Sequence, residues 1–302
     1  MMRIYLLLLL ILMPACSNAA EQGDNRSSAQ QSTSPFEWAG WPDSLWVSPD
    51  GNMAVFMYAR YNFFPTILGK GAPKLEGAAP PNHHKNDKNP WSDSDLYIAF
   101  KDQSGRWSVA HNIPINDGDA DCCAMIAGSE MFFQKATDLY LARYENGQWG
   151  GLEKIGLSSS AVDTNPHYDW QTKTLYWASD RGGNMDIWQA QRLGDNEWSK
   201  AEPVKGAINT AAKEDQPYVQ NGKMRFSRDG ASGNMLSEKT GDSWGEAKAE
   251  NLGTDLYHAE ISLSADEKTA WFIAGDIKNQ KMIFMQTTRQ ADGSWGKAVP
   301  LK

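Results

Sequence analysis

Residues 175–200 read LYWASDRGGNMDIWQAQRLGDNEWSK and contain an aromatic run, a Gly-rich turn, a short alternating run and a Trp-Ser ending. Each apolar run is short and is bounded by glycine, aspartate or asparagine, which is typical of strands joined by tight turns. The run Asp186-Ile187-Trp188 alternates polar and bulky residues with the period of two that a strand requires. This stretch therefore predicts part of a four-stranded antiparallel unit.

The same ending occurs five times along the chain. The five copies are Gly105-Arg106-Trp107-Ser108, Gly147-Gln148-Trp149-Gly150, Asn196-Glu197-Trp198-Ser199, Asp242-Ser243-Trp244-Gly245 and Gly293-Ser294-Trp295-Gly296. Successive tryptophans of this set are 42, 49, 46 and 51 residues apart. Four short strands with their turns occupy about 40–50 residues, so this spacing is typical of a propeller blade.

The interior of each unit repeats as well. The second apolar runs are Met53-Ala54-Val55-Phe56, Met131-Phe132-Phe133, Leu175-Tyr176-Trp177, Met224-Arg225-Phe226 and Thr269-Ala270-Trp271-Phe272. One four-stranded blade cannot bury both of its faces alone, so such units stack around a closed ring. We therefore expect an all-β, five-bladed β-propeller of four-stranded antiparallel blades, with the blades at about residues 43–113, 117–155, 163–204, 213–252 and 255–302.

Two motifs carry a family resemblance. Ser48-Pro49-Asp50-Gly51, and residues 178–183 (ASDRGG) followed by Asp186-Ile187-Trp188 and Trp198-Ser199, resemble the WD-like repeat of TolB-type propellers. The resemblance covers about residues 43–302 and is clearest in the third unit. TolB-type proteins usually have six blades and an additional N-terminal domain, neither of which the sequence of this chain indicates. The resemblance therefore implies the propeller and does not carry the function of TolB over to this chain.

The first residues are predicted to be an export signal. Arg3 supplies a positive charge and Ile4–Leu12 is apolar but too short to be a spanning helix. The residues that end at Cys16 resemble the bacterial lipoprotein signal, which implies removal of residues 1–15 and lipidation of Cys16. Ser17 after the cysteine resembles the choice that directs such proteins to the outer membrane, facing the periplasm. An ordinary cleaved signal peptide is the alternative.

Residues 16–35 are polar, are rich in Ser, Gln and Ala, and have no apolar period. Such a segment cannot offset its ordering entropy, so we expect a disordered tether. The propeller is then expected over residues 36–302.

The charge of the chain argues against one class of partner. Lys and Arg number 29 against 37 Asp and Glu, for a formal net charge of −8. A chain with no basic excess cannot neutralise phosphates, so nucleic acid is not expected as a partner. A cationic or polyhydroxyl ligand fits better.

Cys122 and Cys123 are the two cysteines that remain beside Cys16. They are adjacent, so they can join only through a strained ring. Two reduced cysteines packed beside the channel, a vicinal disulfide, and an intermolecular or metal-binding role all stay open.

The alignment of the five units predicts a ligand site at one mouth of the central channel, where the innermost strand of each blade starts. The predicted ligand-binding residues are Asp43, Asp121, Asn165, Asp215, Gln216, His258 and Glu260. Oxygen atoms at this density suit sugar hydroxyls or a hard cation such as Ca²⁺. No other cofactor is expected. The alternative is that the aspartates cap the turns between blades through backbone amides.

One long irregular stretch, residues 61–94, interrupts the first unit. Loops of this length tend to be functional or disordered. Its aromatic residues are expected either to roof the channel mouth or to lie on a mobile surface loop. The adjacent pair His83-His84 is a weak metal signal, because neighbouring side chains diverge in an extended chain and no ligand follows at metal-binding spacing.

Motifs of hydrolases with a nucleophilic serine, of zinc peptidases and of nucleotide-binding enzymes are absent from the sequence. The leading hypothesis is a non-catalytic envelope lipoprotein whose propeller binds a glycan, a peptide or an envelope protein at the channel mouth. The alternative is a glycoside hydrolase or lyase in which Asp43, Asp121 and Asp215 act as acid and base. A structural scaffold in an envelope complex is a third interpretation, and it predicts an exposed apolar patch.

Overall fold

The computed structural model describes residues 34–67, 70–75, 77, 80, 82–87 and 89–302. The signal peptide expected at residues 1–15, the lipidation site Cys16 and most of the expected tether lie outside the described residues. Within the described part of the chain, no helix is long and apolar enough to cross a membrane.

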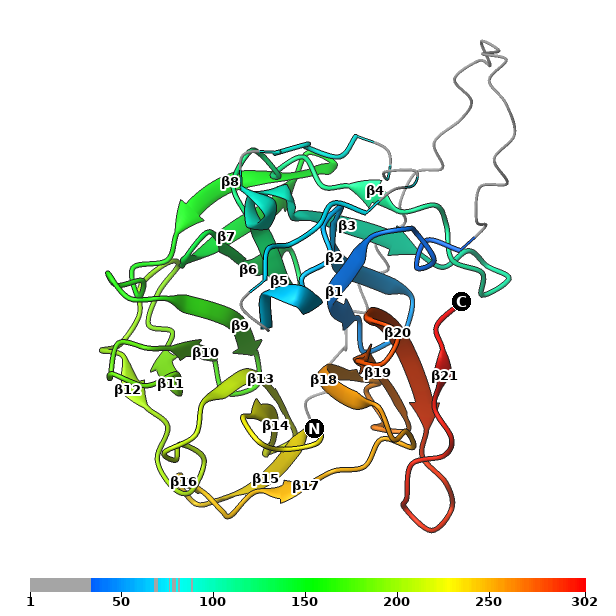
Figure 1. The fold of residues 1–302 in the computed structure, drawn as a ribbon. Helices are drawn as coiled ribbons and strands as arrows, with labels where there is room; N and C mark the ends of the chain where they lie inside the picture. Colours follow the sequence, from blue (N-terminus) through cyan, green and yellow to red (C-terminus); the bar gives the residue numbers. More distant parts are fainter. Residues whose placement is uncertain (1–33, 68–69, 76, 78–79, 81, 88) are drawn as a thin grey trace, which may run out of the picture. The chain divides into compact units, whose positions relative to one another are not determined.

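Five antiparallel sheets surround a central axis, which confirms the all-β, five-bladed propeller that the repeat predicts (Figure 1). Blades 1 and 2 contain β1 (Trp41–Val47), β2 (Met53–Ala59), β3 (Asp95–Phe100), β4 (His111–Asn112), β5 (Asp121–Ala127), β6 (Glu130–Lys135), β7 (Asp138–Glu145) and β8 (Gln148–Lys154). Blades 3 and 4 contain β9 (Asp163–Asp169), β10 (Thr174–Ser179), β11 (Asp186–Gln191), β12 (Glu202–Pro203), β13 (Glu214–Gln220), β14 (Lys223–Arg228), β15 (Met235–Thr240), β16 (Ser243–Trp244) and β17 (Lys248–Ala249). Blade 5 contains β18 (Tyr257–Leu263), β19 (Thr269–Asp276), β20 (Lys281–Thr288) and β21 (Val299–Pro300). In blade 4 the outer strand is divided, and β16 and β17 both pair with β15.

The repeated tryptophan makes the same contact in three of the five blades. It forms an isolated bridge to the residue that follows the third strand, as in Lys101 with Trp107 and Arg289 with Trp295. The basic side chain then lies over the indole, with the Arg289 guanidinium 4.1 Å from the Trp295 ring centroid. Such a cation–π contact contributes about 0.5–1 kcal/mol at an exposed site. The tryptophan that recurs in the sequence therefore makes the same contact at the outer edge of these blades, with the basic residue after the third strand.

The ring closes by packing rather than by a shared strand, since each described blade comes from one continuous stretch of the chain. Phe36 is buried between the first and last blades. Its ring centroid lies 5.4 Å from that of Phe56 in blade 1 and 5.9 Å from that of Phe284 in blade 5. Aromatic pairs at such distances add to the free energy of area burial. The residues before β1 therefore act as an apolar wedge between the two ends of the ring.

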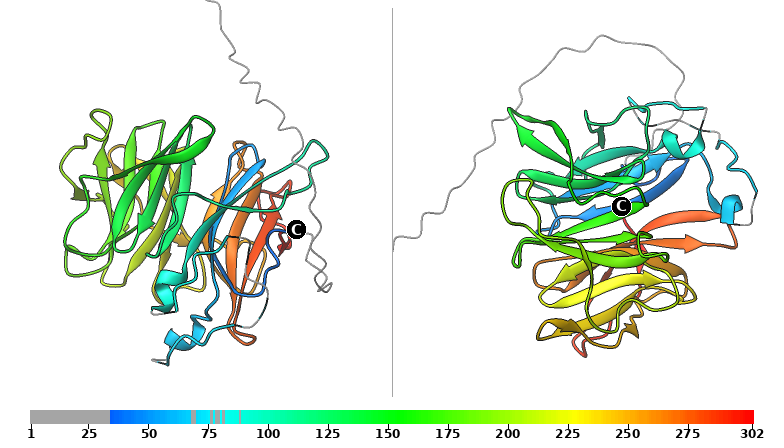
Figure 2. Two further views of the ribbon diagram at one scale, coloured as in Figure 1. Left: turned by 90° about the horizontal axis from the view of Figure 1, so that it is seen from above. Right: turned by 90° about the vertical axis from the view of Figure 1, so that its left-hand side faces the viewer.

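The long connection between β2 and β3 carries the short helices α1 (Phe64–Ile67) and η1 (Pro90–Asp93). It projects from the face of the propeller at which the innermost strands begin, which we name the strand-start face (Figure 2). Phe63 and Phe64 pack on Trp41, the first residue of β1, with ring centroids 5.5 and 4.9 Å away. The opposite face, where the innermost strands turn into the second strands, is named the hairpin face.

Every innermost strand contains a β-bulge at the same level. The register with the second strand shifts after Asp43, Cys122, Thr164, Asp215 and Ala259. A bulge re-aims the side chains that follow it and is frequent beside functional sites. The five bulges therefore set the direction of the side chains that line the channel.

Candidate functional site

The first residue of each bulge has a left-handed backbone, and none of the five is glycine. These residues, which we name the bulge ring, are Ser44, Cys123, Asn165, Gln216 and Glu260, with φ values between 50° and 59°. A left-handed residue with a side chain costs about 1–2 kcal/mol, and such strain gathers at functional sites. All five line one small pocket of about 60 Å³ in the channel.

Hydrogen bonds connect the bulge ring across blades. Glu260 Oε2 accepts the backbone N–H of Ser44 at 2.6 Å, and Glu260 Oε1 accepts from Gln216 Nε2 at 3.0 Å. Asn165 Nδ2 donates to Asp215 Oδ1 at 2.8 Å. Contacts between neighbouring blades thus fix the ring, while Gln216 Oε1 is a buried acceptor with no partner in the described structure.

Three carboxyl groups lie at this level: Asp43, Asp215 and Glu260, which we name the mouth carboxyls. Asp43 and Asp215 each accept the N–H of the next residue, at 3.1 and 2.7 Å. Among the described residues, no Lys or Arg is a leading cause of the pKa shift of any of the three.

The pKa values of the mouth carboxyls are raised. Burial raises the pKa of Asp215 to about 6. Burial, followed by the charge of Asp43, raises the pKa of Glu260 well above its usual range, and burial also raises the pKa of Asp43. Burial raises the pKa of Tyr257 to about 12, and the charges of all three mouth carboxyls add to this shift. Burial therefore favours the protonated form of all three mouth carboxyls.

A second set of carboxyls is fully buried. Each lies one residue before the strand position that Asp43 and Asp215 occupy in their own blades. These paired carboxyls are Asp121, Asp163 and Glu214. Each has a basic partner from its own blade: Lys135 Nζ at 3.2 Å, Arg181 Nη2 at 2.5 Å and Arg228 Nε at 2.7 Å, respectively. Each also accepts a backbone N–H from the segment between blades, at Asp117, Ser159 and Thr210. They hold the blade connections in place.

The structure thus brings together five of the seven predicted site residues: Asp43, Asn165, Asp215, Gln216 and Glu260. It places Asp121 with the paired carboxyls. It also buries His258, whose ring nitrogens contact the carbonyl oxygens of Leu256 and Glu250 at 3.0 Å each. Sequence reasoning missed Ser44 and Cys123 as ring members, because their position depends on the left-handed bulge.

The pair Cys122-Cys123 belongs to the same level. The two Sγ atoms are 2.7 Å apart, and no disulfide joins them in the described structure. Ser44 Oγ donates to Cys123 Sγ at 3.4 Å, which links the pair to blade 1.

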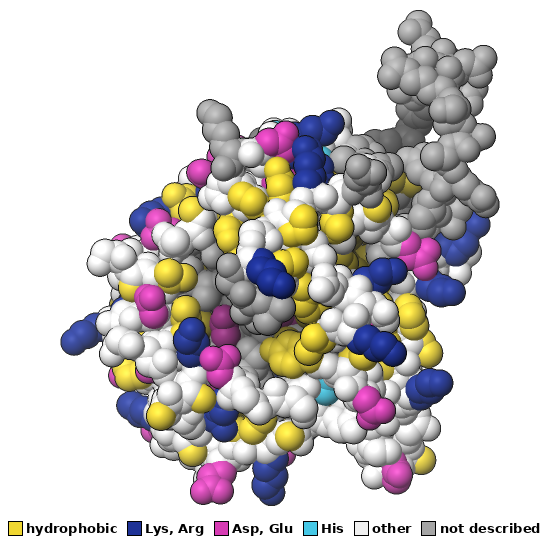
Figure 3. Space-filling model, in the orientation of Figure 1, with side chains coloured by type: hydrophobic (Ala, Val, Ile, Leu, Met, Phe, Trp, Pro, Cys, Tyr) yellow, Lys and Arg dark blue, Asp and Glu magenta, His cyan; other side chains and the backbone are white. Residues whose placement is uncertain are grey.

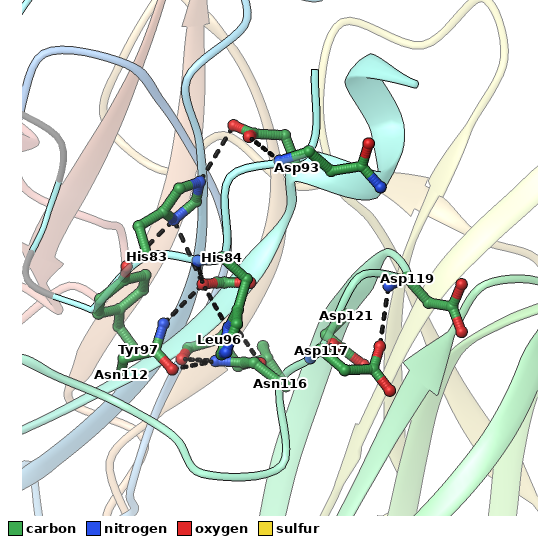
Figure 4. Close-up of polar contacts among 12 residues, drawn as sticks. His83, His84, Asp93, Leu96, Tyr97, Asn112, Asn116, Asp117, Asp119 and Asp121 are labelled. Atoms are coloured by element: carbon green, nitrogen blue, oxygen red, sulfur yellow. Dashed lines mark hydrogen bonds and ion pairs between the residues drawn. The ribbon is translucent and has the colours of Figure 1, made fainter. Parts of the chain in front are cut away.

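His83 and His84 anchor the long connection to blade 1. His83 is buried, with Nε2 3.0 Å from Asp93 Oδ2 and Nδ1 3.1 Å from the Tyr97 hydroxyl (Figure 4). His84 donates its backbone N–H to Asp95 Oδ2 at 2.7 Å. Although burial opposes it, hydrogen bonds from His83 and Arg60 hold the pKa of Asp93 at about 2. No cluster of metal-binding type is found among the described residues.

The aromatic residues of the connection pack mainly on each other. Phe63 is buried and stacks on Trp91 with ring centroids 4.0 Å apart. Trp91 itself is 52% exposed. The strand-start face carries interspersed acidic and basic side chains (Figure 3). Trp91 is therefore the member of this group that remains available to a ligand.

The hairpin face has a wider hollow of about 570 Å³. It is lined by Tyr168, by the exposed Trp170 and by Arg192, which pairs with Glu130 at 2.5 Å. A layer made of Trp46, Met125, His167 and Tyr218 lines both this hollow and the small pocket. That layer divides the channel into two compartments.

No family model matches the sequence, and no curated protein matches it. Among solved structures, the chain is similar to an endo-1,4-beta-xylanase from Bacteroides thetaiotaomicron at 13% identity and a TM-score of 0.51, over 88% of this chain and 100% of that one. It is also similar to TolB from Acinetobacter baumannii at 12% identity and a TM-score of 0.49, over 87% of this chain and 55% of that one. The chain thus spans about half the length of that TolB. A periplasmic gluconolactonase from Pseudomonas aeruginosa gives 9% identity and a TM-score of 0.41, over 84% and 83%.

The fold and the channel ring define the chain as a five-bladed β-propeller. The propeller fold that the TolB-like repeat predicts is confirmed by the five sheets themselves. At identities this low, the likeness to solved structures shows the fold alone.

Proposed function

We propose that this protein is a non-catalytic binding module of the cell envelope, whose strand-start channel mouth accepts a positively charged group of a peptide or protein partner. The carrying observation is that the mouth carboxyls have no basic partner among the described residues, whereas each paired carboxyl has one. A buried carboxylate without a counter-charge is unfavourable, so a cation that enters the site gains the missing interaction.

The chemistry of the pocket favours an ammonium or guanidinium group. Gln216 Oε1 is a buried acceptor that has no donor among the described residues, and the carboxyl-bearing Glu260 lines the same pocket. An N–H cation donates several hydrogen bonds and has no acceptor, so it satisfies both groups at once. A pocket of about 60 Å³ admits the end of one side chain and no more. A basic residue of a peptide or protein fits this volume better than a sugar ring does.

Non-catalytic binding is favoured over hydrolysis by the engagement of Glu260. Both of its carboxyl oxygens already accept hydrogen bonds, from Ser44 and Gln216. Asp43 lies within hydrogen-bond reach of Glu260, whereas glycosidases separate their two carboxyls by about 5–10 Å to hold the substrate between them.

The envelope location is part of the same proposal. The motif that ends at Cys16 supports lipidation, and Ser17 supports the outer membrane with the propeller facing the periplasm. Metabolic labelling with a palmitate analogue, with Cys16→Ser as the control, tests the anchor. Incorporation into both forms equally would contradict it.

The binding proposal is tested with a capped Gly-Lys-Gly peptide added to the full chain and followed by NMR. The lysine-acetylated peptide is the matched control, because it keeps the length and removes the charge. We expect shifts only with the charged peptide, and a loss of at least tenfold in affinity for Asp215→Asn and Glu260→Gln. Asp292→Asn, an exposed carboxyl far along the chain, should change nothing. Equal binding of both peptides, or equal binding by all variants, would refute the proposal.

A hydrolase or lyase remains the second candidate function, and one observation favours it. The pKa of Asp215 is raised to about 6 by burial, as a general acid requires. Release of reducing ends from xylan or arabinan that disappears in Asp215→Asn would establish this activity. A glycan that binds without being cleaved, and that is lost in Trp170→Ala, would instead place the ligand in the hairpin-face hollow.

A further inference from the structure

The backbone of blade 2 turns two adjacent thiols toward each other. In a regular strand, neighbouring side chains point to opposite faces of the sheet. Cys123 departs from this pattern because its φ is 59° and the register of β5 with β6 shifts after Cys122. As a result the two Sγ atoms are 2.7 Å apart, and Cys123 lines the channel pocket.

The surroundings of the pair hold both side chains in place. Cys122 Sγ donates to Gln134 Oε1 at 3.4 Å, and Gln134 also accepts from Thr164 of blade 3. Cys123 Sγ accepts from Ser44 Oγ of blade 1 at 3.4 Å. Among the described residues these are the two cysteines, and both are partly accessible. The pair is therefore pre-oriented by a direct contact to blade 1 and by Gln134, which links it to blade 3.

We infer that Cys122 and Cys123 form a redox modification site, which closes to a vicinal disulfide by exchange with a small disulfide or a disulfide-bearing oxidoreductase. One cysteine attacks the oxidant and forms a mixed disulfide, with release of the first thiol. The second cysteine attacks the mixed disulfide, which forms the Cys122–Cys123 bond and releases the second thiol. The two protein thiols are oxidised, the oxidant disulfide is reduced, and both hydrogens leave with the two released thiols.

The environment predicts a slow reaction. The contact with Cys122, followed by burial, raises the pKa of Cys123 well above its usual range. Since the thiolate is the attacking form, the rate of oxidation should rise with pH. Because the two thiols are in contact, the second cysteine should attack the mixed disulfide quickly. Formation of the Cys122–Cys123 bond is therefore favoured over a stable mixed disulfide.

The bond would also alter the channel site, a consequence that rests on the proposed function. Cys123 contacts Ser44, and the N–H of Ser44 holds Glu260 in the mouth. Movement of Cys123 Sγ toward Cys122 removes the acceptor of Ser44 Oγ. We expect the affinity for the charged lysine peptide to differ at least threefold between the reduced and oxidised forms.

The test uses the full chain, treated either with dithiothreitol or with oxidised glutathione at several pH values, and then alkylated with N-ethylmaleimide. Mass spectrometry of the tryptic peptide 107–135 reports on both cysteines. We expect two alkyl groups in the reduced form, and in the oxidised form no alkyl group with the loss of two hydrogens. Cys122→Ser and Cys123→Ser should each keep one thiol that is alkylated or glutathionylated.

Two alkyl groups after oxidation, a stable glutathione adduct on the wild type, or a dimer joined through these cysteines would overturn the inference. Thermal unfolding of the serine variants verifies that the ring is intact. The mass readout does not depend on the lysine peptide. Loss of peptide binding alone would therefore count against the proposed function and leave the disulfide standing.

Discussion

The mouth carboxyls and the paired carboxyls stand side by side on the innermost strands, and in blade 4 they are the successive residues Glu214 and Asp215. Glu214 is fully buried, and Arg228 Nε approaches its carboxylate to 2.7 Å. The Asp215 carboxyl instead accepts, among the described residues, from the Asn165 amide and from the Gln216 backbone N–H. A shift of one residue thus separates a carboxyl that has a basic partner from one that has none among the described residues.

This difference teaches where to look for function in a chain with many acidic residues. Three of the five innermost strands begin with an acidic residue, namely Asp121, Asp163 and Glu214. Each of these three carboxyls already has a basic partner within the fold, so none of them needs a cation from a ligand. Burial raises the pKa of Asp121 to about 7 despite the opposing charge of Lys135, so a raised pKa alone does not separate the two sets. The presence or absence of a basic partner does.

The largest expected effect comes from breaking a paired carboxyl. Arg228→Met leaves Glu214 buried without its counter-charge. Loss of one partner of a buried pair costs about 3–5 kcal/mol in the free energy of unfolding. Urea denaturation of the full chain measures this change. Lys268→Met, which removes an exposed pair with Asp266, should change stability by less than about 1 kcal/mol. Equal stability of the two variants would remove the distinction between buried and exposed pairs.

The sequence predicts the fold well because the features that define a blade are local. The five tryptophan endings, the Gly-rich turns and the alternating runs each lie within one unit, so they can be counted without a structure. The site is different, because its geometry depends on five β-bulges. Of the left-handed residues in the bulge ring, only Asn165 is of a type that favours this conformation.

The same limit explains why Asp121 was grouped with Asp43 and Asp215. Alignment of the units by their apolar runs does not resolve a shift of one residue, yet one residue decides whether a strand side chain faces the channel or the blade interior. In β5 the residue that corresponds to Asp215 is Cys122, as the register shifts of the two strands show. In β18 the residue that corresponds to Asp215 is Ala259, so Glu260, two residues after His258, occupies the bulge-ring position.

A smaller effect, of opposite sign, is expected at a mouth carboxyl. Asp215→Asn keeps an oxygen that can accept from Asn165 and from the N–H of Gln216, and it removes the charge. The pKa of Asp215 is raised by burial from 3.8 to about 6. An acid whose pKa is higher in the folded chain destabilises the fold as pH rises through this interval, and by a constant amount above it.

The variant should therefore match the wild type in stability near pH 4 and exceed it above pH 7 by about 1–3 kcal/mol. Urea denaturation at both pH values measures the difference. Asp292→Asn, at an exposed position, provides the control for general charge effects. A stability loss at high pH in Asp215→Asn would show that the mouth carboxyls are structural, like the paired set.

Ligand binding should follow the same titration. Because Asp215 becomes charged as the pH passes about 6, the affinity for the charged lysine peptide should rise about tenfold between pH 5 and pH 8. Titrations of the full chain by calorimetry at each pH measure this rise. In Asp215→Asn the remaining pH dependence should be weaker. A constant affinity in the wild type would dissociate binding from the mouth carboxyls.

The smallest expected effect concerns the backbone that separates the two sets. Ser44 has φ of 55°, and its backbone N–H donates to both Asp43 and Glu260. Ser44→Gly keeps this N–H and relieves a left-handed strain of about 1–2 kcal/mol, against about 0.5–1 kcal/mol for the added freedom of the unfolded chain. We expect a net gain of about 0.5 kcal/mol in the free energy of unfolding. Ser44→Ala loses the same contact to Cys123 without relief of strain, so it should be less stable than Ser44→Gly. If the alanine variant were as stable as the glycine variant, the bulge would be unstrained, and the side chains of the ring would owe their direction to their hydrogen bonds alone.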